Sequence, residues 1–160
     1  MELLNEAVAE LQGSRRVVAR PIRIDARIDA FIPAAYVDSE ALKIDLHRRL
    51  ALTDSEDELR ELRADVEDRY GPLPEPVENL FMIQEAKLKL ARAGADYLVF
   101  RGGKLAVGPL VLGSEDLRSL RSAVETAVYS TGSHEVTLRT DTFDAALVLA
   151  DAILELRRAA

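Results

Sequence analysis

Two adjacent glycines in the second half of the chain limit its possible folds more than any other pattern in the sequence. Gly102 and Gly103 lie between two short runs rich in β-forming residues, 97–101 and 104–107. A two-residue glycine turn tolerates positive φ angles at both positions and typically joins the strands of a β-hairpin. The chain is therefore not expected to be entirely helical.

The first 95 residues follow a different pattern. Apolar residues recur there at helical spacing in four segments, which we predict to be helices: 2–12, 39–52, 54–70 and 74–93. Asp38 or Ser39 is the expected cap of the second helix, and Thr53 with Glu56 has capping-box spacing for the third. Gly94 is the expected end of the fourth helix.

The remaining segments are shorter. The sequence predicts an extended segment over 17–32, a short strand at 110–112, a helix capped by Ser114 with apolar positions through Val128, a strand at 136–139, and a final helix capped by Thr140 or Asp141. These elements predict an α+β domain. Its N-terminal part is helix-rich, and a small mixed sheet, made of a β-hairpin and further short strands, follows and packs with helices.

The composition is that of a globular protein. The chain has 160 residues, of which 48% are hydrophobic and none is cysteine. The lack of cysteine excludes disulfide frameworks and thiolate metal sites. The first residues lack the basic region of a signal peptide, and no apolar run approaches the roughly 20 residues of a membrane span. We therefore expect a cytoplasmic protein that does not bind membranes.

The distribution of charge disfavours nucleic acid as a direct partner. The formal net charge is −7, whereas proteins that bind nucleic acids cluster lysine and arginine against the phosphates. Arg15, Arg16 and Arg20 are the nearest approach to a basic patch. Residues 38–70 hold eleven acidic and six basic side chains, a net charge of −5, so most of the excess negative charge lies in one segment.

No pattern of catalytic or metal-binding residues emerges from the sequence. His47 and His134 are far apart and have no partner at ligand spacing. Lys104 follows two glycines, but the upstream glycine and the following Ser or Thr of a phosphate-binding loop are missing. We assign no catalytic, metal or cofactor-binding residue, and we do not expect this chain to be an enzyme on its own.

The predicted helix 54–70 carries a row of acidic residues. Glu61, Asp65 and Asp68 recur at i, i+4 and i+7, on a different face from the apolar residues. Like charges at this spacing cost a helix a few tenths of a kcal/mol each. From the residues alone, the row is either a solvated surface or a docking face for a basic partner.

Two stretches resemble a known family. "DAFIPAAYVDSEALKIDLHRRLA" and "DELRELRADVEDRYGPLPEPVENLF" are similar to the C-terminal domain of bacterial transcription-repair coupling factors, with the Asp-Arg-Tyr-Gly-Pro-Leu-Pro run as the signature. "MELLNEAVAELQG" resembles the segment that joins this domain to the translocase motor. The resemblance covers about residues 1–95. It implies a connecting helix at 1–16 and a C-terminal regulatory domain at 17–160.

The resemblance implies a role inside a larger DNA-repair protein. Factors of this family recognise stalled RNA polymerase, displace it with an ATP-driven translocase and recruit UvrA. Their C-terminal domain packs on the N-terminal UvrB-like module, which masks UvrA binding and restrains the motor. Carried over to this chain, Asp65 and Asp68 would make that contact, with Glu61 extending it. A partner-binding or oligomerisation scaffold and a small enzyme with unrecognised carboxylate chemistry are the alternatives.

Overall fold

The computed structural model of the chain describes residues 22–159. Its helices are α2 (Glu40–Ala51), α3 (Glu56–Tyr70), α4 (Glu75–Ala93), α5 (Ser114–Ala123) and α6 (Asp144–Ala159). Its strands are β1 (Arg23–Ala26), β2 (Tyr97–Arg101), β3 (Lys104–Gly108), β4 (Val128–Ser130) and β5 (Glu135–Arg139). The predicted α+β fold is confirmed. The helix expected at 2–12 and the connecting segment 1–16 lie outside the described residues.

The strands form one mixed sheet. Their order is β1-β2-β3-β5-β4, with β1 parallel to β2 and the other pairs antiparallel. Gly102 and Gly103 have φ angles of 61° and 72°, as expected for the tight turn between β2 and β3. The predicted hairpin is therefore confirmed.

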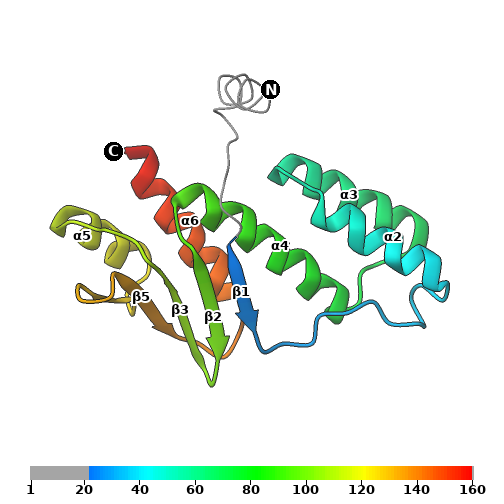
Figure 1. Ribbon diagram of the computed structural model, residues 1–160, viewed down its shortest axis with the longest axis horizontal. Coiled ribbons are helices and arrows are strands. Elements are labelled where there is room, and N and C mark those ends of the chain that lie inside the picture. The colour runs from blue at the N-terminus through cyan, green and yellow to red at the C-terminus, as the bar shows by residue number, and fades with distance from the viewer. Residues whose placement is uncertain (1–21, 160) are drawn as a thin grey trace, which may run out of the picture.

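The domain contains two hydrophobic cores that share helix α4. In Figure 1, the sheet with α5 and α6 lies at one end, α2 and α3 lie at the other, and α4 runs between them. Val77 and Phe81 of α4 belong to the core shared with α2 and α3. Ala86, Leu90 and Ala93 of the same helix belong to the core between the sheet and α6. Helix α4 therefore holds the helical end and the sheet end together.

A buried lysine strengthens the contact between α4 and α6. The Lys89 side chain is 8% exposed, and its ammonium nitrogen lies 2.9 Å from a Glu85 oxygen and 2.7 Å from an Asp151 oxygen. Burial on its own would lower the pKa of Lys89, but the hydrogen bonds with Asp151 and Glu85 outweigh it and raise this pKa. Lys89 therefore stays charged, and its ammonium group is satisfied at the contact between α4 and α6.

Helix α3 begins two residues later than the predicted capping box implies. Ser55, not Thr53, is the N-cap: its hydroxyl accepts a hydrogen bond from the Glu58 amide at 3.1 Å. The Glu58 carboxylate in turn accepts from the Asp54 amide at 2.8 Å. Thr53 is buried and its hydroxyl donates to the Leu50 carbonyl, so it is not available as a cap.

The strand predicted at 110–112 is wrong. Leu110 and Leu112 are buried, but the Tyr129 hydroxyl replaces a strand partner. It donates to the Leu110 carbonyl at 2.6 Å and accepts from the Leu112 amide at 3.2 Å. A short apolar run whose backbone is satisfied by a distant side chain looks like a buried strand in the sequence.

The predicted helix after Ser114 is also too long. Its cap was predicted one residue too late: Gly113, not Ser114, is the N-cap, and the Asp116 carboxylate accepts from the Gly113 amide at 3.1 Å. The helix ends at Ala123, and Val128 instead begins β4, which pairs with β5. Strand β4 was not predicted because apolar positions at helical spacing continue across the turn.

Candidate docking face on helix α3

Helix α3 has strong local reasons to form where it does. Ser55 caps it, acidic residues fill its first turn, and Gly71, with a φ angle of 96°, ends it. Acidic side chains near a helix N-terminus and a glycine past its C-terminus both stabilise the helix. Leu59, Leu62 and Val66 form its buried face. This burial fixes the rotation of the helix and therefore decides which carboxylates face solvent.

The three predicted site residues lie on the side of α3 away from its buried face. Glu61 and Asp68 are exposed, and Asp65 is half-buried next to helix α2. The spacing of i, i+4 and i+7 places them along one side of the helix. We call Glu61, Asp65 and Asp68 the acidic row.

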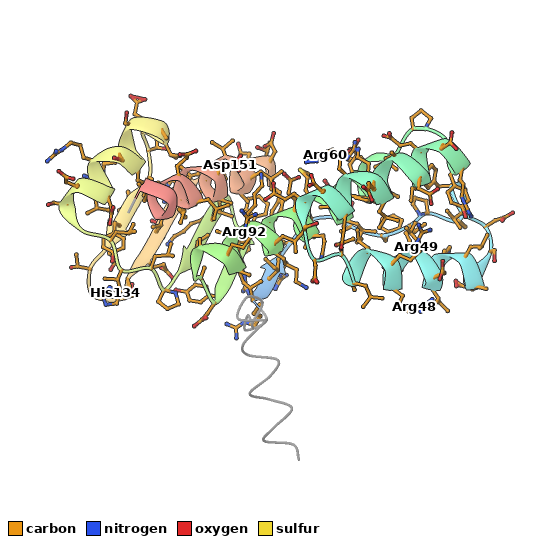
Figure 2. All side chains as sticks on the ribbon, turned by 90° about the horizontal axis from the view of Figure 1, so that it is seen from above. Arg48, Arg49, Arg60, Arg92, His134 and Asp151 are labelled. Atoms are coloured by element: carbon orange, nitrogen blue, oxygen red, sulfur yellow. The ribbon has the colours of Figure 1, made fainter. Side chains whose placement is uncertain are left out.

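Asp65 already has an ion-pair partner within the domain. A guanidinium nitrogen of Arg49, in the last turn of α2, lies 3.0 Å from Asp65 Oδ2. Figure 2 shows Arg49 between α2 and α3, whereas Arg48 lies on the outer side of α2. The two side chains are 41% and 39% exposed, so this pair adds at most about 1 kcal/mol to stability. Asp65 Oδ1 keeps its capacity to accept from a second donor.

The acidic residues of α3 other than Asp65 fall into two groups, those with a hydrogen-bond or ion-pair partner and those without one among the described residues. Four further carboxylates bind nearby groups: Glu56 pairs with Arg92, Asp57 with Arg60, Glu67 with Arg63, and Glu58 accepts from the Asp54 amide. Within residues 22–159, Glu61 and Asp68 have no hydrogen-bond or ion-pair partner. Among the described residues, the acidic row therefore offers two carboxylates without a partner and one that is shared with Arg49.

A shallow groove adjoins the acidic row. It has a volume of about 330 Å³ and is lined by Arg49, Leu52, Thr53, Glu58, Glu61 and Leu62. Leu52, at the end of α2, is 68% exposed, which places an apolar side chain beside the carboxylates. Such a surface suits a partner whose basic side chains have long aliphatic stems. We call it the α2–α3 groove.

The part of the chain that the structure describes shows no metal-binding cluster. No group of three or more His, Cys, Asp or Glu side chains within residues 22–159 is arranged to hold a metal ion. In the same region, none of the helices is both long and apolar enough to cross a membrane. The chemistry that the acidic row and the α2–α3 groove can perform is recognition of positive charge.

Sequence reasoning missed two residues of this face. Arg49 was not assigned because its partner Asp65 is sixteen residues away on another helix, and periodicity within one helix cannot reveal such a pair. Leu52 was assigned only as the last residue of a helix. Its place beside the acidic row depends on how α2 packs on α3.

Comparisons with known proteins concern the family and the fold of the chain. The TRCF domain family matches residues 26–108, just over half of the chain. The chain is 30% identical over 108 residues to a transcription-repair-coupling factor of Staphylococcus epidermidis, covering 66% of the chain and 9% of that protein. It is 33% identical over 88 residues to the factor of Bacillus subtilis, covering 54% of the chain and 8% of that protein. The chain thus spans about a tenth of the length of these relatives.

The fold also matches a solved structure. The chain superimposes on a crystal structure of the C-terminal domain of a transcription-repair coupling factor with a TM-score of 0.76 and 17% sequence identity. The alignment covers 89% of this chain and 98% of that domain. The matched unit is a small C-terminal domain, not a catalytic domain. The chain belongs to the TRCF domain family of transcription-repair coupling factors.

Proposed function

We propose that this chain is an autoinhibitory interaction domain of a transcription-repair coupling factor. It uses the acidic row to dock on the UvrB-like N-terminal module of the same protein, where it masks the UvrA-binding surface and restrains the translocase. The observation that carries the proposal is a pair of carboxylates, Glu61 and Asp68, which have no partner within residues 22–159 and lie on an exposed side of α3 inside the TRCF-family match. Membership of the family supports this intramolecular setting.

The geometry suits a reversible contact. Surface ion pairs contribute about 0–1 kcal/mol each, so three of them hold a docked state weakly unless apolar contacts add to them. Leu52 beside the row supplies such a contact. A difference of a few kcal/mol between the docked and open states is enough for a partner that binds elsewhere to shift the equilibrium. RNA polymerase and UvrA would act on this equilibrium indirectly.

Arg49 has a defined place in this mechanism. Its bond to Asp65 Oδ2 orients the carboxylate and leaves Oδ1 for an arginine or lysine of the docking partner. Arg49 also reduces the negative charge of the face. Replacing it with glutamine would therefore strengthen the electrostatic attraction of a basic partner while loosening the orientation of Asp65.

The direct test is charge reversal of the row in the full-length coupling factor. Asp65→Lys with Asp68→Lys should expose the UvrA site and raise the resting ATPase rate, because like charges replace attractive ones across the interface. The matched control is Glu115→Lys with Glu125→Lys, which reverses two exposed carboxylates in the sheet half. If Asp65→Lys with Asp68→Lys binds UvrA and hydrolyses ATP as the control does, the acidic row does not hold the domain in the docked state.

An oligomerisation scaffold is the second candidate. Two exposed apolar residues favour it, since Ile44 of α2 is 65% exposed and Leu52, directly after α2, is 68% exposed. Gel filtration of the chain across a range of concentrations distinguishes the two functions. A stable dimer that dissociates in Ile44→Ser with Leu52→Ser would support the scaffold, whereas a monomer at all concentrations would count against it.

A further inference from the structure

Within the described residues, the sheet has one covered face and one open face. Side chains from α4, α5 and α6 pack on one set of alternating strand residues, which form the core: Leu98, Phe100, Leu105, Val107, Val136 and Leu138. Successive residues of a strand point to opposite faces, so the intervening residues form the other face. None of these intervening side chains belongs to a buried cluster of the described residues. We call this surface the open face.

A row of basic residues crosses one end of the open face. Arg101 is directly opposite Lys104, and Lys104 is directly opposite Arg139, on β2, β3 and β5. Arg27 continues the row past the end of β1, where its amide bonds to the Phe100 carbonyl. Like charges directly opposite each other destabilise a sheet. We call Arg27, Arg101, Lys104 and Arg139 the basic row.

Most of this positive charge is unopposed. Arg101 pairs with Asp25, but Arg27, Lys104 and Arg139 have no side-chain partner within the described residues. Many of the arginines in the helical half are instead paired: Arg48, Arg49, Arg60, Arg63 and Arg92 each contact a carboxylate. Within the described residues, the basic row therefore gathers three cations without a side-chain partner at one end of the sheet, in a chain whose net charge is −7.

The remaining carboxylate of the open face is also engaged. The Tyr97 hydroxyl donates to a Glu135 oxygen at 2.7 Å, reaching across Gly108 of the intervening strand. A Cβ atom on Gly108 would lie 2.9 Å from that hydroxyl oxygen, so the glycine makes room for the crossing. Glu135 is thus held at the other end of the face from the basic row. Glu135 is therefore not available to neutralise Arg27, Lys104 or Arg139.

An apolar strip lies beside the basic row. Val99, Ala106 and Thr137 are in register on β2, β3 and β5, and Val128 of β4 completes the strip at the sheet edge. Val128 is 57% exposed. The strip is two residues along each strand from the basic row, a distance of about 6.5 Å. The open face therefore presents parallel lines of positive charge and apolar surface.

We propose that the open face binds an acidic amphipathic helix of a partner protein, laid across the strands. Neighbouring strands are about 4.8 Å apart, close to the 5–6 Å between residues i and i+4 of a helix. One stripe of such a helix would place carboxylates on the basic row, and the adjoining stripe would cover Val99, Ala106 and Val128. Arginine matches carboxylates in paired hydrogen bonds, which gives the contact direction.

Nucleic acid fits this surface less well. Tyr97 is the one aromatic residue among the described open-face positions, and its hydroxyl is tied to Glu135, so the stacking platforms of single-strand binders are missing. A phosphate backbone would also leave the apolar strip unused. The open face and the acidic row are at opposite ends of the molecule: in Figure 2, His134 at the sheet end is far from Arg48 and Arg49. This inference therefore stands independently of the proposed docking of α3.

The test measures binding of a defined probe to the 160-residue chain. The probe is a fluorescein-labelled helical peptide of about 18 residues, with glutamates at i, i+4, i+7 and i+11 and leucines on the adjoining stripe. Lys104→Glu with Arg139→Glu should weaken binding at least about tenfold, because two attractive contacts become repulsive. Arg118→Glu with Arg121→Glu, which makes the same charge change on α5, should alter binding less than about twofold.

Further measurements separate the competing explanations. Lys104→Gln with Arg139→Gln removes the two positive charges without reversing them, so it should weaken binding by an intermediate factor. This variant still tests the proposal if charge reversal disturbs folding. The same peptide with glutamine in place of glutamate should lose most of its affinity. Equal peptide binding by the wild type and the Lys104/Arg139 variants would overturn the proposal. So would tighter binding of a labelled oligonucleotide, or self-association that depends on this face.

Discussion

Single residues in this domain are tuned by neighbours from distant parts of the chain. Tyr97 meets Glu135 only because β2, β3 and β5 stand side by side. Burial and then the hydrogen bond to Glu135 raise the pKa of Tyr97 to about 12. Asp65 meets Arg49 only because α2 packs on α3. Neither pair follows from local spacing, which is why the sequence predicted the acidic row but not its internal partner.

The Tyr97–Glu135 bond makes the titration of Tyr97 testable. Glu135→Gln should lower the pKa of Tyr97, yet leave it above the ordinary value of 10.0, because burial is the larger cause and remains. Ultraviolet absorbance of tyrosinate across an alkaline titration measures this change. The matched control is Glu125→Gln, which should leave the Tyr97 titration unchanged. An unaltered titration in Glu135→Gln would show that the hydrogen bond does not hold the phenol proton.

The same shift has a consequence for stability at high pH. A pKa that is higher in the folded state than in the unfolded state means that the folded state binds the proton more tightly. The stability that Tyr97 contributes is therefore complete below pH 10 and is lost as the pH rises through about 12. Urea denaturation at pH values between 10 and about 12 should therefore show a smaller loss of the free energy of unfolding for Tyr97→Phe than for the wild type.

At the scale of elements, sequence reasoning succeeded where a signal is local. The paired glycines specify the β2–β3 hairpin, and apolar periodicity with the closing Gly94 specifies α4. Sequence reasoning failed at residues 110–112, because the distant Tyr129 hydroxyl binds backbone groups there. It failed at β4 because the backbone of that strand pairs with β5, a contact that no local pattern encodes. The strand register that builds the basic row is equally non-local.

The corrected helix caps can be tested by two serine substitutions. Ser55→Ala should destabilise the domain by about 1 kcal/mol, because the Glu58 amide loses its acceptor at the start of α3. Ser114→Ala should change stability by only a few tenths of a kcal/mol, because Gly113 rather than Ser114 occupies the cap position of α5. Thermal unfolding of both variants checks this ordering. Equal losses would contradict the assignment of the caps.

The strand register predicts that the basic row costs stability. Lys104→Glu would place a carboxylate directly opposite both Arg101 and Arg139, and each cross-strand pair is worth about 0.2–1 kcal/mol. The variant should therefore unfold at a higher temperature than the wild type at low salt. The gain should shrink at high salt because exposed charges are screened. A lower unfolding temperature at low salt would contradict the register or the exposure of the row.

At the scale of the whole molecule, the acidic row and the basic row lie at two ends joined by α4, and the sequence of each end carries a net negative charge. The helical end carries the acidic row, and the sheet end carries the basic row. The net charge of −7 conceals the basic row, so composition alone points to the acidic segment and says nothing of the basic residues. A domain with two such surfaces can meet two partners at once. This arrangement is consistent with a regulatory role inside a multidomain factor.

The central claim is that the acidic row holds this domain on the UvrB-like module. It is tested most directly by titrating the isolated module with the 160-residue chain at several salt concentrations. We predict that affinity falls steeply with salt for the wild type, and that Glu61→Gln with Asp65→Asn and Asp68→Asn binds more weakly with a shallower salt dependence. Equal affinity and equal salt dependence for the two proteins would contradict the account.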